Sequence, residues 1–387
     1  MRRTMAAFVA ALAIVLMAGL GQGGADLLRA GSAGSGQAAE SSGAGKRSAD
    51  TAVAAAGAAT LGLKTVSHNI CGGQCNQGGT GRLSYITDQI DAYQPHMVML
   101  QEVCWSQYEW FKSHSFASGT YQFGYTGLLT NYTGCGASNC AVNEDTDPNN
   151  DDRRCWIGQV VAARGTLSNR DEIALGGERH QIKTNATTGA VEPVNPPRTF
   201  TALCYDAALS DLPGRVVKGC SVHLRSFHDP DLINQRARTA QAARLASDLD
   251  GDVAAGKIVV VGGDFNSWSD HNRTPAMDAL YRSDAAPGGG WGVFYEADQD
   301  DANHYGKVGC DAAAKACRSG APTLVGSQTK YDYLFYSETT DPASVSGYTI
   351  DLYVRDAAGN IVKDAAGNDV KVSDHSFYRG LAQVATS

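Results

Sequence analysis

The sequence has no excess of positive charge. Its 387 residues include 32 lysines and arginines against 40 aspartates and glutamates, which gives a formal net charge of −8 at pH 7. Proteins that bind nucleic acids tightly and without sequence preference use basic side chains to neutralise phosphates. The charge balance therefore excludes a broad basic surface, although cations that bridge locally would still bring phosphate to an acidic site.

The chain also lacks an apolar run of full membrane-spanning length near its N-terminus. The run at residues 5–20 has about sixteen residues, whereas a bilayer-spanning helix needs roughly twenty. Arg2 and Arg3 precede the run and small residues follow it through Ala25, which is the layout of a secretory signal. We predict a cleaved signal peptide at residues 1–30 and a secreted protein without stable membrane insertion. Retention through an uncleaved membrane anchor is the alternative.

Large apolar side chains are scarce in residues 31–60, which are almost entirely alanine, glycine and serine. Such a segment has too little apolar surface to offset the entropy lost on ordering, so we predict a flexible linker. Residues 61–387 are numerous enough to bury a large core, and we expect them to form the folded part of a monomer.

All ten cysteines lie in this folded part. In an exported chain an even number of cysteines indicates disulfides. Proximity along the sequence favours the pairs Cys71–Cys75, Cys135–Cys140, Cys204–Cys220 and Cys310–Cys317, which leaves Cys104 for Cys155. Spacing alone does not determine connectivity. The two shortest spacings, Cys71 to Cys75 and Cys135 to Cys140, would also suit zinc, the weaker alternative in an oxidising compartment.

The pattern of apolar residues predicts a layered α/β protein whose sheets pack face to face. Helical spacing occurs at residues 83–90 and 242–249, and two continuous apolar runs predict buried strands. One of these runs ends at Glu102 and the other at Asp264, so both deliver an acid to a strand tip. Further strands are expected at residues 64–70, 156–163, 221–224, 331–336 and 348–354.

Two stretches depart from this pattern. Residues 113–197 are rich in glycine, asparagine, aspartate and threonine, so we expect inserted loops held by cysteines. Within them Asp145, Asp147, Asn149 and Asp151 alternate like oxygen ligands of a structural calcium ion. The glycine of a calcium-binding turn is missing, which favours a solvated acidic loop. The pentapeptide Asp-Ala-Ala-Gly-Asn occurs at residues 356–360 and 364–368, which predicts two turns of a protruding hairpin.

The polar residues at strand ends suit the hydrolysis of a phosphoester. This reaction needs a hard cation, an aligned water molecule and groups that exchange protons. Oxygen ligands of the kind that magnesium prefers are Glu102, Asp264, Asn266 and Asp374. His223 ends a strand and His375 follows Asp374 directly, and two histidines suit proton transfer near neutral pH.

Taken in order along the chain, these residues resemble the endonuclease/exonuclease/phosphatase superfamily, whose fold is that of deoxyribonuclease I. The matching motifs are Asn69, Gln101-Glu102, His223, Gly263-Asp264-Phe265-Asn266, Tyr331-Asp332-Tyr333 and Ser373-Asp374-His375. The resemblance covers essentially all of residues 61–387 and makes them the catalytic domain. It implies an α/β fold, a four-layer α/β/β/α sandwich, with the disulfide-bearing loops as an insertion.

The resemblance also implies roles for single residues. Metal ligands would be Glu102 and Asp374, phosphate-binding residues Asn69 and Asn266, and catalytic residues His223, Asp264, Asp332 and His375. In these roles Asp264 orients or deprotonates the attacking water, His375 contacts the scissile phosphate with Asp332 as its partner, and His223 assists the leaving group. The implied cofactor is Mg²⁺, with Mn²⁺ as an alternative. His68 has no assigned role, and candidates for a phosphate-binding arginine are Arg164, Arg198 and Arg225.

From these features we predict a secreted, metal-dependent hydrolase that acts on nucleic acid, DNA or RNA, as a nuclease. Alternatives within the superfamily are a sphingomyelinase-like lipid phosphodiesterase and a phosphomonoesterase. A non-enzymatic binding protein is the remote alternative, because none of the expected catalytic residues is missing. Trp105, Tyr108 and Trp110 would either contact nucleic acid or pack in the core. The polar hairpin counts against an enzyme that inserts into lipid.

Overall fold

The computed structural model describes residues 59–114, 121–129, 132–136, 153, 155–177, 180–185, 187–193, 199–226, 233–267, 275–283, 290–299 and 320–387. The predicted signal peptide, the linker up to residue 58, the alternating acids at 145–151, Arg198 and the pair Cys310–Cys317 lie outside these residues.

One half of the strands surrounds β1. The hydrogen-bonded order is β12-β13-β1-β2-β4-β3, with bounds β12 Ser346–Ile350, β13 Phe377–Ala385, β1 Thr60–Asn69, β2 Met97–Cys104, β4 Ile157–Ala174 and β3 Tyr121–Leu129. Strands β1 and β2 are parallel, whereas β13 runs antiparallel to β1. The carboxyl ends of β1 and β2 therefore meet at one edge.

The other half continues from the same long strand, β4. Its order is β4-β7-β8-β9-β11-β10, with bounds β7 Thr201–Leu209, β8 Val217–His223, β9 Ile258–Asp264, β11 Asp332–Tyr336 and β10 Tyr295–Glu296. Residues 157–164 of β4 pair with β2 and β3, and residues 165–174 pair with β7. Gly165 lies at the crossing, where a Cβ atom would stand 2.2 Å from the carbonyl oxygen of Ala208. Glycine is thus required where the chain passes from one half to the other.

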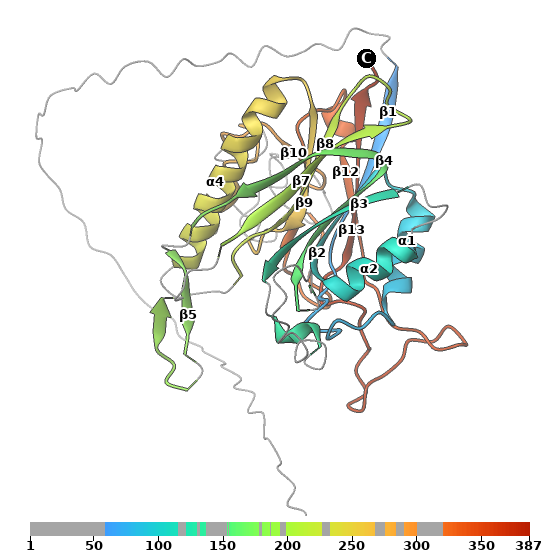
Figure 1. Ribbon diagram of the computed structural model, residues 1–387, viewed down its shortest axis with the longest axis vertical. Helices are drawn as coiled ribbons and strands as arrows, with labels where there is room; N and C mark the ends of the chain where they lie inside the picture. The colour runs from blue at the N-terminus through green and yellow to red at the C-terminus, as the bar shows by residue number, and fades with distance from the viewer. Residues whose placement is uncertain are drawn as a thin grey trace, which may run out of the picture. The chain divides into compact units, whose positions relative to one another are not determined.

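Three separate apolar clusters show that the molecule has four layers. The inner faces of the two sheet halves share one cluster, to which β1 contributes Leu63 and β9 contributes Val260. Helices α1 (Leu83–Tyr93) and α2 (Trp105–Ser113) pack on the outside of the first half. Helix α4 (Ile233–Ala254) packs on the outside of the second half. Figure 1 shows α4 and the α1–α2 pair on opposite sides of the strands, which confirms the α/β/β/α sandwich.

The remaining elements are short. They are the hairpin strands β5 (Ile182–Thr184) and β6 (Val191–Pro193) and the 3-10 turns η1 (Thr133–Cys135), η3 (Pro275–Met277) and η5 (Pro342–Ser344). Within the described part of the chain, no helix has both the length and the apolar character that a membrane crossing requires.

The local sequence explains the main elements. In α1 the buried positions include Leu83, Ile86 and Ile90, the residues whose helical spacing predicted it. Strand β9 is buried along its whole length between the inner cluster and α4, which explains its unbroken apolar run. The two Asp-Ala-Ala-Gly-Asn segments form tight turns, in which Asp356 and Asp364 each accept backbone hydrogen bonds from residues two and four positions later. They are the two predicted turns of the protrusion.

Two predictions about the inserted region were wrong. The disulfides Cys71–Cys75 and Cys204–Cys220 are confirmed, but Cys104 pairs with Cys135, so the predicted pairs Cys104–Cys155 and Cys135–Cys140 are both wrong. The reason is that η1 folds back onto the end of β2, a contact that sequence distance does not reveal. The region is also richer in strands than predicted, because it contains β3, an extended β4, and the pair β5–β6.

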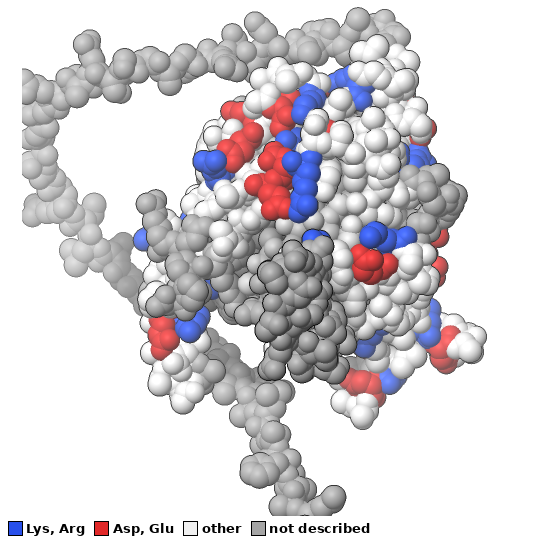
Figure 2. Space-filling model, viewed as in Figure 1, with Lys and Arg blue, Asp and Glu red and all other residues white. Residues whose placement is uncertain are grey.

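Charged residues on the surface are mixed rather than segregated. Figure 2 shows basic and acidic atoms interspersed on the face above the central strands. Here Lys218 pairs with Asp171 and Asp252 at 2.8 and 2.7 Å. On this face the arrangement agrees with the lack of a broad basic surface expected from composition.

Candidate active site

Three buried side chains meet where β9 ends and β11 begins. The strands are antiparallel and pair Asp264 with Asp332, so both carboxylates lie at the same edge. His375 approaches from the segment before β13; its Nδ1 lies 2.7 Å from Asp332 Oδ2 and its Nε2 lies 3.5 Å from Asp264 Oδ2. The imidazole is therefore held between two acids. We call Asp264, Asp332 and His375 the site cluster.

The surroundings of His375 favour its charged form. Burial opposes the charge, but the carboxylates of Asp332 and Asp264 outweigh it and raise the pKa of His375 to about 10. Burial also raises the pKa of Asp332, against the opposing effect of the imidazolium. At neutral pH the pair is thus an ion pair, in which Nδ1 donates to Asp332 and Nε2 presents a second N–H toward Asp264.

A third acid, Glu102, joins this group through an amide. Asn69, the last residue of β1, donates from Nδ2 to Glu102 Oε1 at 3.2 Å and to Asp264 Oδ2 at 3.1 Å. Its Oδ1 accepts from the backbone of Cys71, which fixes the orientation of the amide. Ser373 donates to the carbonyl oxygen of Asn69 at 2.6 Å. The site therefore links the ends of β1, β2 and β9 to the segment that carries His375.

The backbone is strained at two of these positions. Glu102 has φ of 55° and Asn266 has φ of 49°, a region that residues with a Cβ rarely adopt. Strand β2 also carries a pairing irregularity between Leu100 and Val103. Each such residue costs on the order of 1 to 3 kcal/mol, and such strain is concentrated at functional sites. The bulge places Glu102 beside Asn69.

His223 connects this group to a cavity. Its Nε2 lies 3.6 Å from Asp264 Oδ2 and 4.0 Å from Glu102 Oε1. His223 and Glu102 both line a cavity of about 450 Å³. Glu102 and His223 are therefore accessible from this cavity, where a substrate can enter, and the buried Asp264 lies directly behind them.

The donor set is suited to a divalent cation. The cluster of Asp264, Asp332 and His375 offers three ligand atoms within 4.8 Å of one another. However, the protonated imidazole of His375 has no lone pair to give. Glu102 fits a hard cation better, since it is an oxygen donor with its side chain 26 % exposed at the cavity, and Asp264 is its neighbour through Asn69.

The other predicted site residues have more peripheral positions. The Asp374 carboxylate is exposed and lies within 4.8 Å of the sulfur atoms of Cys71 and Cys75. Asn266 donates to the carbonyl oxygen of Leu224 at 3.2 Å, and its backbone N–H donates to Asp264 Oδ1. The structure thus brings seven of the eight predicted residues into one network of contacts around Asp264, and the eighth, Asp374, lies next to His375 in the sequence.

The unassigned candidates now have positions. His68 is buried beside Phe377, and its Nδ1 contacts the carbonyl oxygen of Ser376; burial lowers the pKa of His68 to about 3, so it is neutral. Arg164 pairs with Asp211 at the opposite end of residues 157–164. Arg225 is fully buried and donates to Asn234 and to the carbonyl oxygen of Ile182. These contacts give Arg164 a structural role, whereas Arg225 also lines the cavity beside Glu102 and His223.

The aromatic residues after Glu102 lie in α2 and pack inward. Trp105 and Tyr108 contact each other and Tyr125, and Tyr108 is buried. Core packing therefore explains these side chains better than contact with nucleic acid. Trp110 stacks on His114 within the same helix region.

Sequence reasoning missed one residue that supports the site. The Thr323 hydroxyl accepts hydrogen bonds from the backbone N–H groups of Tyr331 and Asp332, at 2.8 and 2.9 Å. It fixes the start of β11 and with it the Asp332 carboxylate. A lone threonine in a loop carries no sequence signal of this role.

The family can now be assigned. A profile of the Endonuclease/Exonuclease/phosphatase family matches residues 66–375 of this chain. The chain belongs to this family. The match begins within β1 and ends at His375, so it includes every residue of the site. Membership makes the chain a phosphoester hydrolase.

Solved structures give a weaker likeness. Truncated TDP2 from Caenorhabditis elegans shares 14 % identity at a TM-score of 0.46, over 83 % of this chain and 97 % of that one. The catalytic domain of human Nocturnin shares 16 % identity at 0.47, over 84 % and 98 %. A family protein from Bacteroides thetaiotaomicron shares 11 % identity at 0.49, over 84 % and 96 %. A search of curated proteins found no match.

Proposed function

We propose that this member of the Endonuclease/Exonuclease/phosphatase family is a secreted, metal-dependent phosphodiesterase that cleaves nucleic acids. The observation that carries the proposal is the position of Asp264 Oδ2, which lies within 3.6 Å of Asn69 Nδ2, His223 Nε2 and His375 Nε2. One carboxylate oxygen surrounded by three such groups is poised to hold a water molecule for attack on phosphorus.

Each residue then has a defined task. Asp264 orients the water and takes its proton as the new P–O bond forms. His375, held protonated by Asp332, donates to a phosphate oxygen and stabilises the charge that develops there. His223 faces the cavity and gives a proton to the departing oxygen as its bond to phosphorus breaks. Asn69 holds the carboxylates of Glu102 and Asp264 close together by donating a hydrogen bond to each.

A divalent cation is expected at Glu102. Such an ion, Mg²⁺ in our proposal, would neutralise phosphate charge when bound. Mn²⁺ is the alternative, since it accepts the same oxygen ligands. The full-length charge of −8 makes this neutralisation important, because few basic side chains are available to attract a polyanion.

A soluble substrate fits the surface better than a lipid. The large apolar side chains that are exposed in the described residues are Val191, Val216, Trp291 and Tyr348, each on a different element or loop. The protrusion ends in the exposed turns at residues 356–360 and 364–368, which carry aspartate, glycine and asparagine. An enzyme that enters a membrane interface would need apolar residues there.

The proposal is tested with the full chain exported from a host cell into an oxidising compartment. Plasmid nicking and sphingomyelin hydrolysis are followed in parallel with Mg²⁺, with chelator, and with His375→Ala. We expect nicking that chelator and the substitution both abolish. Cleavage of sphingomyelin with intact DNA would overturn the nucleic-acid assignment, and activity that resists chelator would overturn the metal.

A further inference from the structure

The cavity beside Glu102 and His223 has a second wall that the proposed chemistry does not use. This wall is apolar and comes from the ends of β3 and β4, from the η1 turn and from the start of β7: Leu128, Leu129, Tyr132, Ile157 and Phe200. Gln74, Thr199 and Ser226 add polar groups at its rim, and the buried Arg225 also lines it. About 450 Å³ is within the size range of small-ligand sites, which combine apolar walls with a few polar groups.

The wall is built around a disulfide. Cys104 and Cys135 are fully buried and, together with Ile157, form a small apolar cluster against which Leu129 and Tyr132 pack. Cys104 lies two residues after Glu102 in β2, so the bridge joins the wall directly to the strand that carries the expected metal ligand. The distance from the chemistry to the wall is thereby fixed.

Two glycines leave the space that the ring of Tyr132 occupies. A Cβ atom on Gly73 would stand 2.3 Å from Cε1 of Tyr132, and one on Gly134 would stand 2.4 Å from the same atom. Any larger residue at either position would move the ring. Tyr132 is half-buried, so it remains in contact with the cavity. Its ring is therefore a closely packed, partly accessible flat surface.

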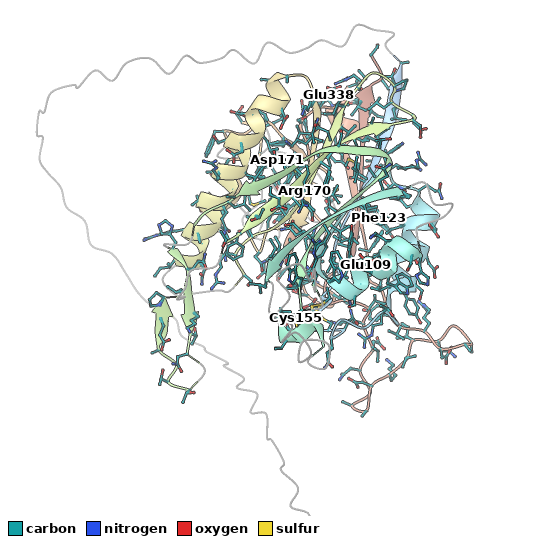
Figure 3. The ribbon with its side chains drawn as sticks, viewed as in Figure 1. Glu109, Phe123, Cys155, Arg170, Asp171 and Glu338 are labelled. Carbon is teal, nitrogen blue, oxygen red and sulfur yellow. A yellow bond between two sulfur atoms is a disulfide. The ribbon has the colours of Figure 1, made fainter. Side chains whose placement is uncertain are left out.

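Figure 3 shows the end of the sheets at which β4 begins. Cys155, two residues before β4 begins, lies at the lower end of the view, and Glu338, two residues after β11 ends, lies at the upper end. Strand β11 begins with Asp332, a member of the site cluster. The wall and the site cluster thus share the lower end.

We propose that this cavity receives one unstacked nucleobase next to the scissile phosphate, and that the enzyme therefore prefers single-stranded to duplex nucleic acid. The inference rests on the function proposed above. Aromatic rings such as Tyr132 and Phe200 suit the flat face of a base, and the polar rim suits its edge. A base inside a duplex would first have to leave the stack, at a cost of a few kcal/mol.

An acyl chain is the main competing occupant. Its pocket would have no need of polar groups at the rim or of a flat aromatic ring, because a flexible chain gains nothing from stacking. The polar residues Gln74, Thr199 and Ser226 favour the base.

The test compares three DNA substrates of the same sequence with the full-length wild-type enzyme and Mg²⁺. These are a single strand, its duplex, and a single strand that lacks the base beside the cleaved bond. We expect the intact single strand to be cleaved at least roughly tenfold faster than either of the others, since stacking on an aromatic ring contributes about 1 to 3 kcal/mol. Equal rates on all three would overturn the inference.

Variants then locate the effect. Tyr132→Ala and Phe200→Ala should each bring the ratio of intact to abasic rates toward one. Gly73→Ala should do so more weakly, by displacing the ring. Tyr348→Ala removes an exposed tyrosine on β12, outside the cavity, and should leave the ratio unchanged. A ratio that Tyr132→Ala and Phe200→Ala both leave unchanged would show that the base does not occupy this cavity.

The bridge provides an independent check. The double variant Cys104→Ser and Cys135→Ser should also lower the ratio, while circular dichroism reports whether the chain remains folded. If no nucleic acid is cleaved in any form, the proposed function fails. If single and double strands are cleaved alike, only the base pocket fails. If sphingomyelin vesicles are cleaved and Tyr132→Ala slows that reaction, the cavity belongs to a lipid.

Discussion

Two buried clusters of charged side chains lie on either side of the residues that lead into β11. Asp332 belongs to the site cluster, whereas Lys330, two residues earlier, belongs to a second group formed with Glu296, Asp298 and Tyr378. We call this second group the structural cluster. Lys330 Nζ lies 3.0 Å from Glu296 Oε1 and 3.4 Å from Asp298 Oδ2, and the Tyr378 hydroxyl donates to Glu296 at 2.9 Å.

The two clusters are alike in burial and in their shifted pKa values. Burial raises the pKa of Glu296 to about 7, against the opposing effect of Lys330. They differ in what their members contact. Asp264 in the site cluster contacts His223, which lines the cavity, whereas Lys330, Glu296 and Asp298 bond to one another, to Tyr378 and to the backbone of Ala321. A shifted pKa alone therefore does not identify a functional group; a connection to a cavity is also needed.

The largest expected effect is on catalysis, from Asp332→Asn. Without the carboxylate the pKa of His375 falls, and the imidazole no longer carries a charge to the phosphate. We expect a loss of roughly 10²- to 10⁴-fold in kcat on a phosphodiester substrate. Asp298→Asn is the matched control, because it makes the same chemical change in the structural cluster. A loss of similar size in the control, with the protein still folded, would erase the distinction between the clusters.

The next effect is on stability, from Lys330→Met. This change leaves the fully buried Glu296 without its cation, and breaking a buried ion pair from one side costs about 3 to 5 kcal/mol. Urea unfolding would measure the loss, and activity per folded molecule should stay near the wild-type value. Adding Glu296→Gln should restore most of the stability. If Lys330→Met were as stable as the wild type, the ion pair between Lys330 and Glu296 would not stabilise the fold.

The sequence predicted the site better than it predicted the walls around it. Continuous apolar runs must be buried strands, and a polar residue at the end of such a run has to lie at a sheet edge, so Glu102 and Asp264 could be located in advance. That the two residues meet in one site was predicted from the family resemblance of the ordered motifs. The Cys104–Cys135 bridge could not be predicted, because its two cysteines are 31 positions apart and meet only after the chain has passed through α2 and β3.

Strands with mixed composition were also missed. In β3, glycines and polar residues interrupt the apolar pattern, and Gly124 is needed because a Cβ there would stand 2.1 Å from the ring of Tyr205. Gly124 lets the ring of Tyr205 pack against β3, but a glycine also interrupts the apolar pattern from which a strand is predicted. The same applies to Thr323, whose role arises only once β11 is in place.

The third effect is on how the free energy of unfolding depends on pH, and it arises from His375 in the site cluster. The pKa of His375 is about 10 in the folded protein against 6.5 for the free group, so its contribution to stability is complete below pH 6.5 and is lost as the pH rises through 10. Between pH 6.5 and 9 we expect a fall of about 3 kcal/mol in the free energy of unfolding without added metal. His375→Gln should flatten this slope. A slope that persists unchanged in that variant would assign it to another group.

The smallest effect comes from a charged pair outside both clusters. Lys363 and Asp369 pair on the protrusion, where their side chains are 57 % and 37 % exposed. Solvent screens such a pair, and its net contribution is only about 0 to 1 kcal/mol. We therefore expect Lys363→Met to change the free energy of unfolding by less than about 0.5 kcal/mol and to leave activity on a phosphodiester substrate unaltered. Because the same substitution at Lys330 is expected to cost several times more, the two variants measure how far burial alone changes the cost of removing one lysine from its acid. Similar losses at both positions in parallel urea titrations would mean that burial does not set that cost in this fold.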